Sequence, residues 1–228
     1  MPVRLFTCLA GCAVLAMLAG CGGSSSSSSG IGSESPQKIL NDSLAAANGL
    51  KSVHAAGTIN SGGQHIAIDI QLVNGVGGKG QITLGGLSFK LVGINHYAYM
   101  QAPPAVWQKA GAPASAAQQL QGKWLRTPAT GQFASVASLT DIRTLFGQLL
   151  NQHGKSLKTG AESTVAGRKV VAVRSGQGTL YVAATGKPYP VELIKTGSEG
   201  GKLDFDRFNQ TVGLSAPSNT LNLPQTSG

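Results

Sequence analysis

Cys21 is the residue whose position most clearly suggests chemistry in this chain. It directly follows the tripeptide Leu18-Ala19-Gly20, and an apolar run from Leu5 to Leu18 precedes it behind the basic residue Arg4. A basic start, an apolar run and small residues before a cut are the features of a secretory signal peptide, and this run is too short to span a membrane as a helix. The pattern therefore predicts that residues 1–20 are a removable leader and that Cys21 presents its thiol at the cut.

These residues also resemble the lipobox of bacterial lipoproteins, in which the cysteine is lipidated and becomes the new N-terminus. The alternative is an ordinary secretory signal in which Cys21 stands by chance. The resemblance implies a protein attached to the extracytoplasmic face of the cell membrane through the lipid on Cys21. Two acyl chains suffice for such an attachment to be stable.

The residues after Cys21 predict a tether followed by a folded domain. Residues 21–35 contain a run of six Ser among further Gly and Ser, a composition that is typical of a flexible coil. Residues 36–228 are expected to form a single domain. Removal of the leader also removes Cys8 and Cys12, so no disulfide framework and no thiolate metal site is expected.

No other pattern in the chain indicates catalysis or metal binding. A G-x-S-x-G sequence is absent, and lipidation would consume Cys21. The four His residues, at positions 54, 65, 96 and 153, do not have the spacing of a metal site. Asp204 and Asp206 would share one face of a strand, but no third acidic ligand stands near them. We therefore expect no enzymatic activity, no cofactor and no bound metal.

The chain is basic, with 18 Lys and Arg against 9 Asp and Glu and a formal net charge of +9. The basic residues are scattered singly from Lys51 to Arg207, and only Arg168 and Lys169 are adjacent. Nucleic-acid-binding proteins usually cluster such residues and place aromatic side chains among them. We therefore expect no nucleic-acid partner and attribute the charge to solubility and to attraction towards a membrane surface.

Apolar periodicity predicts helices and strands in the order of an α+β protein. A helix is expected over 36–48, short helices over 105–110 and 114–120, and a longer helix opened by a capping box at 138–141. Strands are expected at 65–72, 81–84, 87–91, 96–100, 123–126, 156–165, 169–174, 178–182, 191–195 and 202–208. These ten strands are interpreted as one antiparallel sheet.

Several of these segments carry rows of large apolar side chains. Three rows belong to strands, and they are Ile66, Ile68, Ile70 and Leu72, then Ile82 and Leu84, then Leu87, Phe89 and Leu91. The fourth is a helical stripe that contains Ile142, Leu145, Phe146 and Leu149. Such rows would serve equally well as the lining of a cavity or as a filled core, and for the helical stripe alone core packing is favoured.

The order of several short motifs resembles a known family. The motifs are Leu50–Thr58, Tyr97–Tyr99 before Trp107–Lys109, Gly122–Leu125, Leu180–Val182 followed by Gly186–Pro188, and Leu203–Phe205. Together with the lipobox they resemble the actinobacterial LppX/LprAFG lipoproteins, relatives in shape of the LolA/LolB lipoprotein carriers. The resemblance implies a strongly curved half-barrel sheet whose concave face is covered by helices around an apolar cavity. Members of this family bind acylated lipids and help to carry them through the cell envelope.

The expected function is therefore that of a membrane-anchored extracytoplasmic lipoprotein. It would bind an acylated lipid or glycolipid in the apolar cavity and carry or present it in the cell envelope. Exposing two palmitoyl chains to water would cost on the order of 25 kcal/mol, so a carrier must enclose the chains. The alternative is a surface scaffold or adhesion lipoprotein with a filled core and no cargo.

Overall fold

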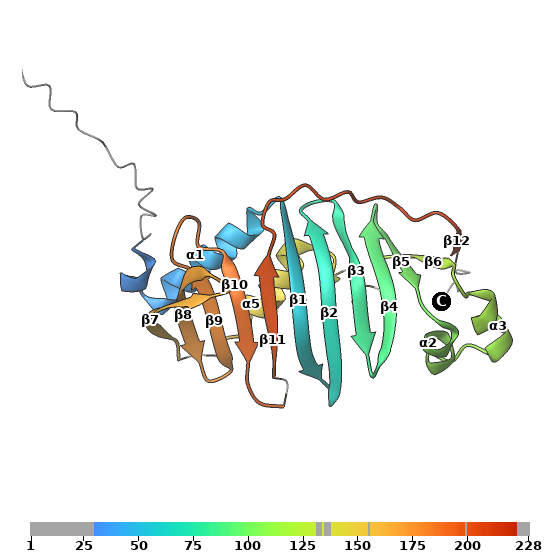
Figure 1. The fold of residues 1–228 in the computed structure, drawn as a ribbon, viewed down its shortest axis with the longest axis horizontal. Helices are drawn as coiled ribbons and strands as arrows, with labels where there is room; N and C mark the ends of the chain where they lie inside the picture. Colours follow the sequence, from blue (N-terminus) through green and yellow to red (C-terminus); the bar gives the residue numbers. More distant parts are fainter. Residues whose placement is uncertain (1–29, 131–133, 135–137, 155, 199, 223–228) are drawn as a thin grey trace, which may run out of the picture.

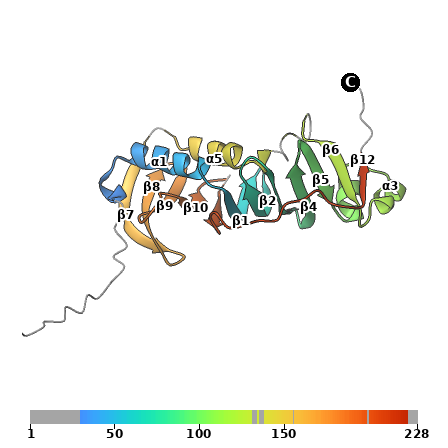
Figure 2. The same cartoon turned by 90° about the horizontal axis from the view of Figure 1, so that it is seen from above.

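The computed structural model describes residues 30–130, 134, 138–154, 156–198 and 200–222. The expected leader, Cys21 and most of the expected tether therefore lie outside the described residues. The described residues form one curved, unclosed sheet of twelve strands with helices on one side (Figures 1 and 2). This confirms the expected α+β class.

The elements follow the expected order along the chain. They are η1 (Ile31–Ser33), α1 (Pro36–Asn48), β1 (Ser52–Ser61), β2 (Gln64–Val73), β3 (Gly77–Leu84), β4 (Leu87–Ile94), β5 (Tyr97–Gln101), α2 (Pro104–Lys109), α3 (Ala114–Gln119), β6 (Trp124–Pro128), α5 (Ile142–Asn151), β7 (Lys158–Val165), β8 (Arg168–Ser175), β9 (Gly178–Ala183), β10 (Pro190–Lys195), β11 (Gly201–Asp206) and β12 (Thr220–Asn222).

The sheet consists of two antiparallel meanders that meet in its middle. Its strand order is β12-β6-β5-β4-β3-β2-β1-β11-β10-β9-β8-β7, and all neighbours are antiparallel except β12 and β6. Two-residue turns join several of the successive strands, such as β3 and β4, where Gly85 and Gly86 both take the positive φ that such a hairpin turn requires. The two meanders join where β1 pairs with β11, with His54 opposite Asp206.

The strand count corrects the expected ten. β1 was not expected because Ala55, Ala56 and Gly57 hide its alternation, which leaves Val53 and Ile59 as its large apolar residues. β12 is only three residues long and pairs in parallel with β6 after a stretch of turn-forming residues. Both strands depend on partners distant in sequence, which local periodicity does not report.

The start of α5 also differs from the expected capping box. Asp141 is the N-cap, and its Oδ1 accepts a hydrogen bond of 2.7 Å from the backbone N–H of Thr144. Ser138, which the box pattern takes as the cap, lies one turn upstream. The capping-box pattern places Asp141 at the third position of the helix. In the structure Asp141 is the N-cap itself, because its carboxylate accepts a hydrogen bond from a backbone N–H at the start of the helix.

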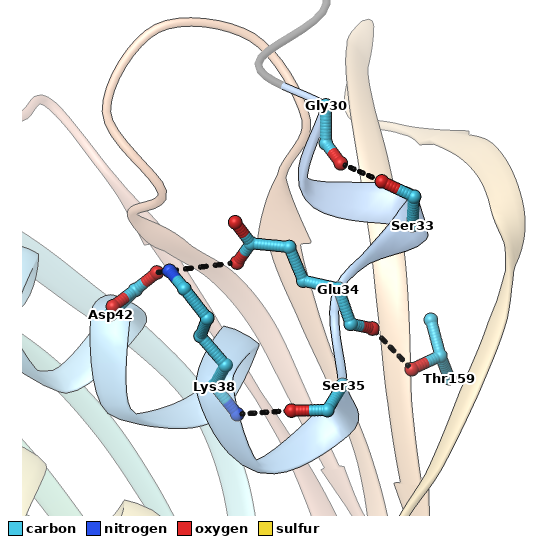
Figure 3. Close-up of polar contacts among 7 residues, drawn as sticks. All are labelled: Gly30, Ser33, Glu34, Ser35, Lys38, Asp42 and Thr159. Atoms are coloured by element: carbon cyan, nitrogen blue, oxygen red, sulfur yellow. Dashed lines mark hydrogen bonds and ion pairs between the residues drawn. The ribbon is translucent and has the colours of Figure 1, made fainter.

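Residues just before Pro36 contact the folded part of the chain. Ile31 is 4% exposed and packs into the main apolar cluster. The Thr159 hydroxyl of β7 donates a hydrogen bond of 3.4 Å to the carbonyl oxygen of Glu34 (Figure 3). Lys38 Nζ lies 3.1 Å from Glu34 Oε2 and 2.6 Å from Asp42 Oδ2. These contacts attach η1 and the first turn of α1 to the sheet edge.

Helices cover one face of the sheet, which we call the inner face. α1 and α5 lie side by side over the half that contains β7–β11, β1 and β2 (Figure 2). α2 and α3 pack against the same face near β5 and β6, where Trp107 contacts Leu125 in one cluster. The main core of the protein therefore lies between α1, α5 and the inner face.

The opposite face is here called the outer face. Residues 207–219, which we call the C-terminal strap, run on this side of the sheet along one end of the strands (Figures 1 and 2). The backbone N–H of Asn209 donates to the carbonyl oxygen of Ser52 at 2.9 Å, and Lys79 Nζ donates to the carbonyl oxygen of Gly213. Leu214 packs against a cluster formed by Val92, Ile94, Tyr97, Tyr99 and Trp124. The strap thus links the middle of the sheet to its β12 edge.

Candidate functional site

The apolar rows expected on the strands lie side by side on the inner face. Ile68 pairs with Ile82 across β2 and β3, and Ile82 pairs with Phe89 across β3 and β4. Alternation along each strand puts the remaining row members on the same face. They are Ile66, Ile70, Leu72, Leu84, Leu87 and Leu91.

The candidate residues do not all share one environment. Those on β2 and on α5 pack together in the main cluster, and they are Ile68, Ile70, Leu72, Ile142, Leu145 and Phe146, with Ile66 and Leu149 at its border. The rings of Phe146 and Phe205 lie 4.9 Å apart, centre to centre, which ties α5 to β11. Phe89 belongs instead to the cluster beneath α2 and α3. Ile82 and Leu91 are buried between these regions, whereas Leu84 and Leu87 are half-buried.

A narrow apolar slot opens between the helices and the strands of the second meander. Its walls are Leu40 from α1, Leu149 and Leu150 from α5, Leu157, and Val173, Leu180 and Leu193 from β8, β9 and β10. Its volume is about 30 Å³, which is room for only about two water-sized spheres. The slot is therefore closed to an acyl chain in this conformation.

The mouth of the slot is polar. Gln152 and His153 at the end of α5 face Gln177 and Lys195 from the strands. Lys195 Nζ donates a hydrogen bond of 3.4 Å to Gln152 Oε1, so one polar contact spans the mouth. An apolar floor beneath a polar rim is the usual make-up of a site for an amphipathic ligand.

Few residues of this slot were predicted from the sequence. Leu149 is the only candidate cavity residue among its lining residues. The other apolar walls are Leu40 and Leu150 from two helices, Leu157, and residues of strands that were expected but whose inward positions were not singled out. The run Val170–Val173 and the alternation of Leu180 with Val182 were the available signals.

The first turn of α5 is fixed to the sheet by a bed of small residues. Gly78 and Gly93 have no side chain, and Thr140 occupies the space above them. A Cβ at Gly93 would lie 2.1 Å from Thr140 Oγ1, so only glycine permits this approach. Together with the Asp141 cap this fixes the N-terminal end of α5, whereas its C-terminal end borders the slot.

On the outer face, Lys202 and His54 each contact two carboxylates. Lys202 Nζ contacts Glu192 Oε2 at 2.7 Å and Asp204 Oδ1 at 3.2 Å. The hydrogen bond that Lys202 donates to Glu192, together with a weaker effect of the one that it donates to Asp204, raises the pKa of Lys202 above its ordinary value against the opposing effect of burial. The imidazole of His54 lies between two carboxylates, with Nδ1 2.6 Å from Asp206 and Nε2 3.0 Å from Asp69.

Neither a metal site nor a membrane-spanning helix emerges from the described part of the chain. Within it, no group of three or more His, Cys, Asp or Glu side chains is placed to hold a metal ion. No helix in the same residues is long and apolar enough to cross a membrane.

Comparison with known proteins identifies the fold. No family model and no curated protein matches the chain. The structure of LprF from Mycobacterium bovis is similar, with a TM-score of 0.53 and 15% identity over 80% of this chain and 96% of that one. The Mycobacterium tuberculosis lipoprotein LppX gives a TM-score of 0.50 and 16% identity over 79% of this chain and 100% of that one. The chain therefore has an LppX/LprF-type lipoprotein fold, which confirms the resemblance at the level of fold.

Proposed function

We propose that this chain is a membrane-anchored extracytoplasmic lipoprotein that binds an acylated lipid or glycolipid and carries or presents it in the cell envelope. The observation that carries the proposal is the slot, an apolar floor with a polar mouth beneath two helices on a fold of the LppX/LprF type. The anchor would be the lipid on Cys21. The chemistry is burial, without a reaction.

The walls of the slot match an acyl chain with a polar head. Leu40, Leu180 and Leu193 offer only carbon atoms to a chain, and each methylene moved out of water contributes about 0.8 kcal/mol. Gln152 and His153 at the mouth offer donors and acceptors to a head group. A lipid would therefore enter tail first and leave its head at the end of α5.

Loading requires the C-terminal half of α5 to move away from the strands, because the closed slot is too small for a chain. Leu149 and Leu150 would swing outwards, and the Gln152–Lys195 hydrogen bond would break. The anchored first turn of α5 would serve as the pivot. Movement about that pivot would extend the slot towards Ile68, Ile70, Phe146 and the other inner-face rows expected to line the cavity.

The second candidate function is the scaffold or adhesion lipoprotein. The observation in its favour is the close packing of the main cluster, in which Ile39, Ile142 and Phe146 are fully buried. On this alternative the helices stay on the sheet and no cargo binds. The two functions therefore differ in whether the slot ever opens.

Native mass spectrometry of residues 21–228, purified gently from a lipid-containing bacterial host, tests the proposal. We expect a discrete added mass that is lost on denaturation and is identified as an acylated lipid in the extract. A clean protein mass, together with no uptake of offered fatty acids or glycolipids, would contradict the carrier function and favour the scaffold.

A pair of variants locates the cargo. Leu149→Gln puts an amide into the slot wall and should weaken binding of a fluorescent fatty acid about fourfold or more, the equivalent of one buried methylene. Val76→Gln makes the same kind of change at an exposed apolar residue outside the slot and should leave binding unchanged. Equal effects in the two variants would show that the slot is not the site.

A further inference from the structure

Four basic side chains that are scattered in the sequence meet in one hollow at the rim of the sheet. The hollow has a volume of about 620 Å³, and we call it the rim pocket. Its lining includes Arg168, Lys169, Lys187 and Arg207, together with the aromatic rings of Tyr189 and Phe208. No Asp or Glu lies among its lining residues.

Topology brings these residues together. In the antiparallel second meander the end of β7, the start of β8, the β9–β10 connection and the end of β11 all lie at one end of the strands. The β8 start carries Arg168 and Lys169, the β9–β10 connection carries Lys187, and Arg207 follows β11. Residues up to 39 positions apart thereby form one surface, which their scatter along the chain did not suggest.

The pocket is built around an aromatic floor. The rings of Tyr189 and Phe208 stack 4.9 Å apart with 23° between their planes. The Arg168 guanidinium lies over the Phe208 ring at 4.9 Å, and the Tyr189 hydroxyl accepts a hydrogen bond of 3.1 Å from Asn209 Nδ2. These contacts position the cation and hold both rings in place.

The protein's own carboxylates do not neutralise the pocket. Six of the described carboxylates lie within 4 Å of a nitrogen atom of Lys38, Lys202 or His54. Glu34 and Asp42 contact Lys38, Glu192 and Asp204 contact Lys202, and Asp69 and Asp206 contact His54. Within the described residues none of the four pocket cations forms an ion pair. Four cations in one hollow repel one another, so an anion from outside relieves that repulsion.

We propose that the rim pocket binds the phosphate of an anionic phospholipid head group in the membrane to which the protein is attached. Two guanidinium groups can grip phosphate oxygens through paired hydrogen bonds, and two lysines add charge. Tyr189 and Phe208 suit the boundary between head groups and acyl chains, where amphipathic and aromatic rings are stable. This site is separate from the cargo slot and rests on the proposed function only for the membrane attachment.

The start of the described chain supports a membrane source for the phosphate. Gly32 lies against Val171 and Glu162, so the chain enters the fold beside β8, two residues along that strand from Lys169. Residues 22–29, which separate Cys21 from Gly30, are Gly and Ser alone. Nine residue steps reach at most about 32 Å. A lipid on Cys21 would therefore hold the rim pocket close to the head groups.

Vesicle co-sedimentation tests the proposal with residues 21–228, the thiol of Cys21 being blocked so that no acyl anchor contributes. Cooperative thermal unfolding is established first for each protein. We expect binding to vesicles of phosphatidylcholine with phosphatidylglycerol, little binding to phosphatidylcholine alone, and a loss of binding as salt rises. Equal binding to both kinds of vesicle would overturn the proposal.

A matched pair of double variants separates the pocket from general charge. Arg168→Gln with Lys169→Gln should weaken binding about tenfold or more, since each cation near an anionic surface contributes roughly fivefold. Lys158→Gln with Arg174→Gln removes the same charge from the opposite end of β7 and β8, where the two residues are cross-strand partners. This control should bind within about twofold of the unaltered protein. Equal losses in both double variants would overturn the proposal.

Soluble anions and the cargo assay complete the test. Inorganic phosphate or a single-stranded oligonucleotide that saturates the protein, when the vesicles do not, would assign the pocket to a soluble anion and overturn the proposal. The Arg168→Gln, Lys169→Gln variant should still bind a fluorescent fatty acid normally. Failure of the slot function would appear in that assay, and failure of the rim pocket would appear in the vesicle assay.

Discussion

At the scale of single residues, the ion pair between Glu192 and Lys202 contributes to the stability of the sheet. Glu192 is 6% exposed, yet it is an ionisable group on the outer face of the sheet. Its counter-ion is Lys202, whose ammonium lies 2.7 Å away and is half-exposed. A buried carboxylate that loses its partner retains the full desolvation penalty. A substitution that removes Lys202 should therefore lower the stability of the protein.

Replacing Lys202 tests this dependence. We expect Lys202→Met to lower the free energy of unfolding by about 1–3 kcal/mol, because it leaves the Glu192 carboxylate without its donor. Lys202→Arg keeps a donor at the site and should lose less. Chemical denaturation of the three proteins at neutral pH provides the measurement, and an unchanged midpoint for Lys202→Met would contradict the assignment.

The same pair has a predicted pH dependence. The hydrogen bond that Lys202 donates to Glu192 raises the pKa of folded Lys202 above the ordinary value of 10.5. A raised folded pKa means that the stabilisation is complete below about 10.5 and declines as the pH rises through the folded value. The stability difference between the unaltered protein and Lys202→Met should thus stay constant from neutral pH to about pH 9 and shrink above 10.5. A difference that grows in alkali would have the wrong sign.

At the scale of elements, α5 has two unequal ends. Its first turn is held by the Asp141 cap and by Thr140 above Gly78 and Gly93, whereas its last turn, which carries Leu149 and Leu150, borders the slot. A helix fixed at one end can tilt without unfolding. The cap therefore contributes to stability and also defines the pivot of the proposed movement.

Substitution at the cap tests both contributions. Asp141→Ala removes the acceptor of the Thr144 N–H and should cost about 1 kcal/mol of stability. Asp141→Asn keeps an acceptor and should cost markedly less. Thermal unfolding compares the two variants. If alanine and asparagine are equally harmful, the carboxylate has another role and the cap assignment is wrong.

Elements with a strong local pattern were predictable, whereas those that depend on distant partners were not. The helix from Pro36 to Asn48 and the strands around Ile68 and Leu91 follow from periodicity and turn glycines alone. β1 was not predicted because its alanines and glycine are too small to show an alternation of apolar and polar side chains. β12 was not predicted because three residues are too few to show any periodicity. The slot was not predicted for a related reason. Its walls come from five separate elements together with Leu157, and no pattern along the sequence shows that these residues lie close together.

At the scale of the whole molecule, the C-terminal strap holds the long sheet together from outside. The long axis runs from η1 and β7 at one end to α3 and β12 at the other (Figure 1). The strap starts at β11 near the middle, covers the Val92–Tyr99 cluster with Leu214 and ends as β12 on the edge strand β6. It therefore covers apolar surface and shields part of an open edge at the same time.

Two truncations test the role of the strap. Ending the chain after Gln210 removes Leu214 and β12, and we expect a lower unfolding temperature and concentration-dependent association through the exposed β6 edge. Ending it after Asn222 removes none of the described residues and should change neither property. Scattering and thermal unfolding at several protein concentrations provide the measurement. Identical behaviour of the two truncated chains would contradict the role assigned to the strap.

The pairing of β1 with β11 has a consequence for how the chain folds. Within each meander, successive strands are close in sequence, but His54 and Asp206 in the central pair are 152 residues apart. Contacts that span so much chain form late, since the loop must close before they contribute. The two meanders should consequently form first, with β1 and β11 as unpaired edge strands, and the seam between them should close last. If two chains associate before the seam closes, β1 of one chain can pair with β11 of the other. A domain-swapped dimer is therefore the misfolded product that we expect from this topology.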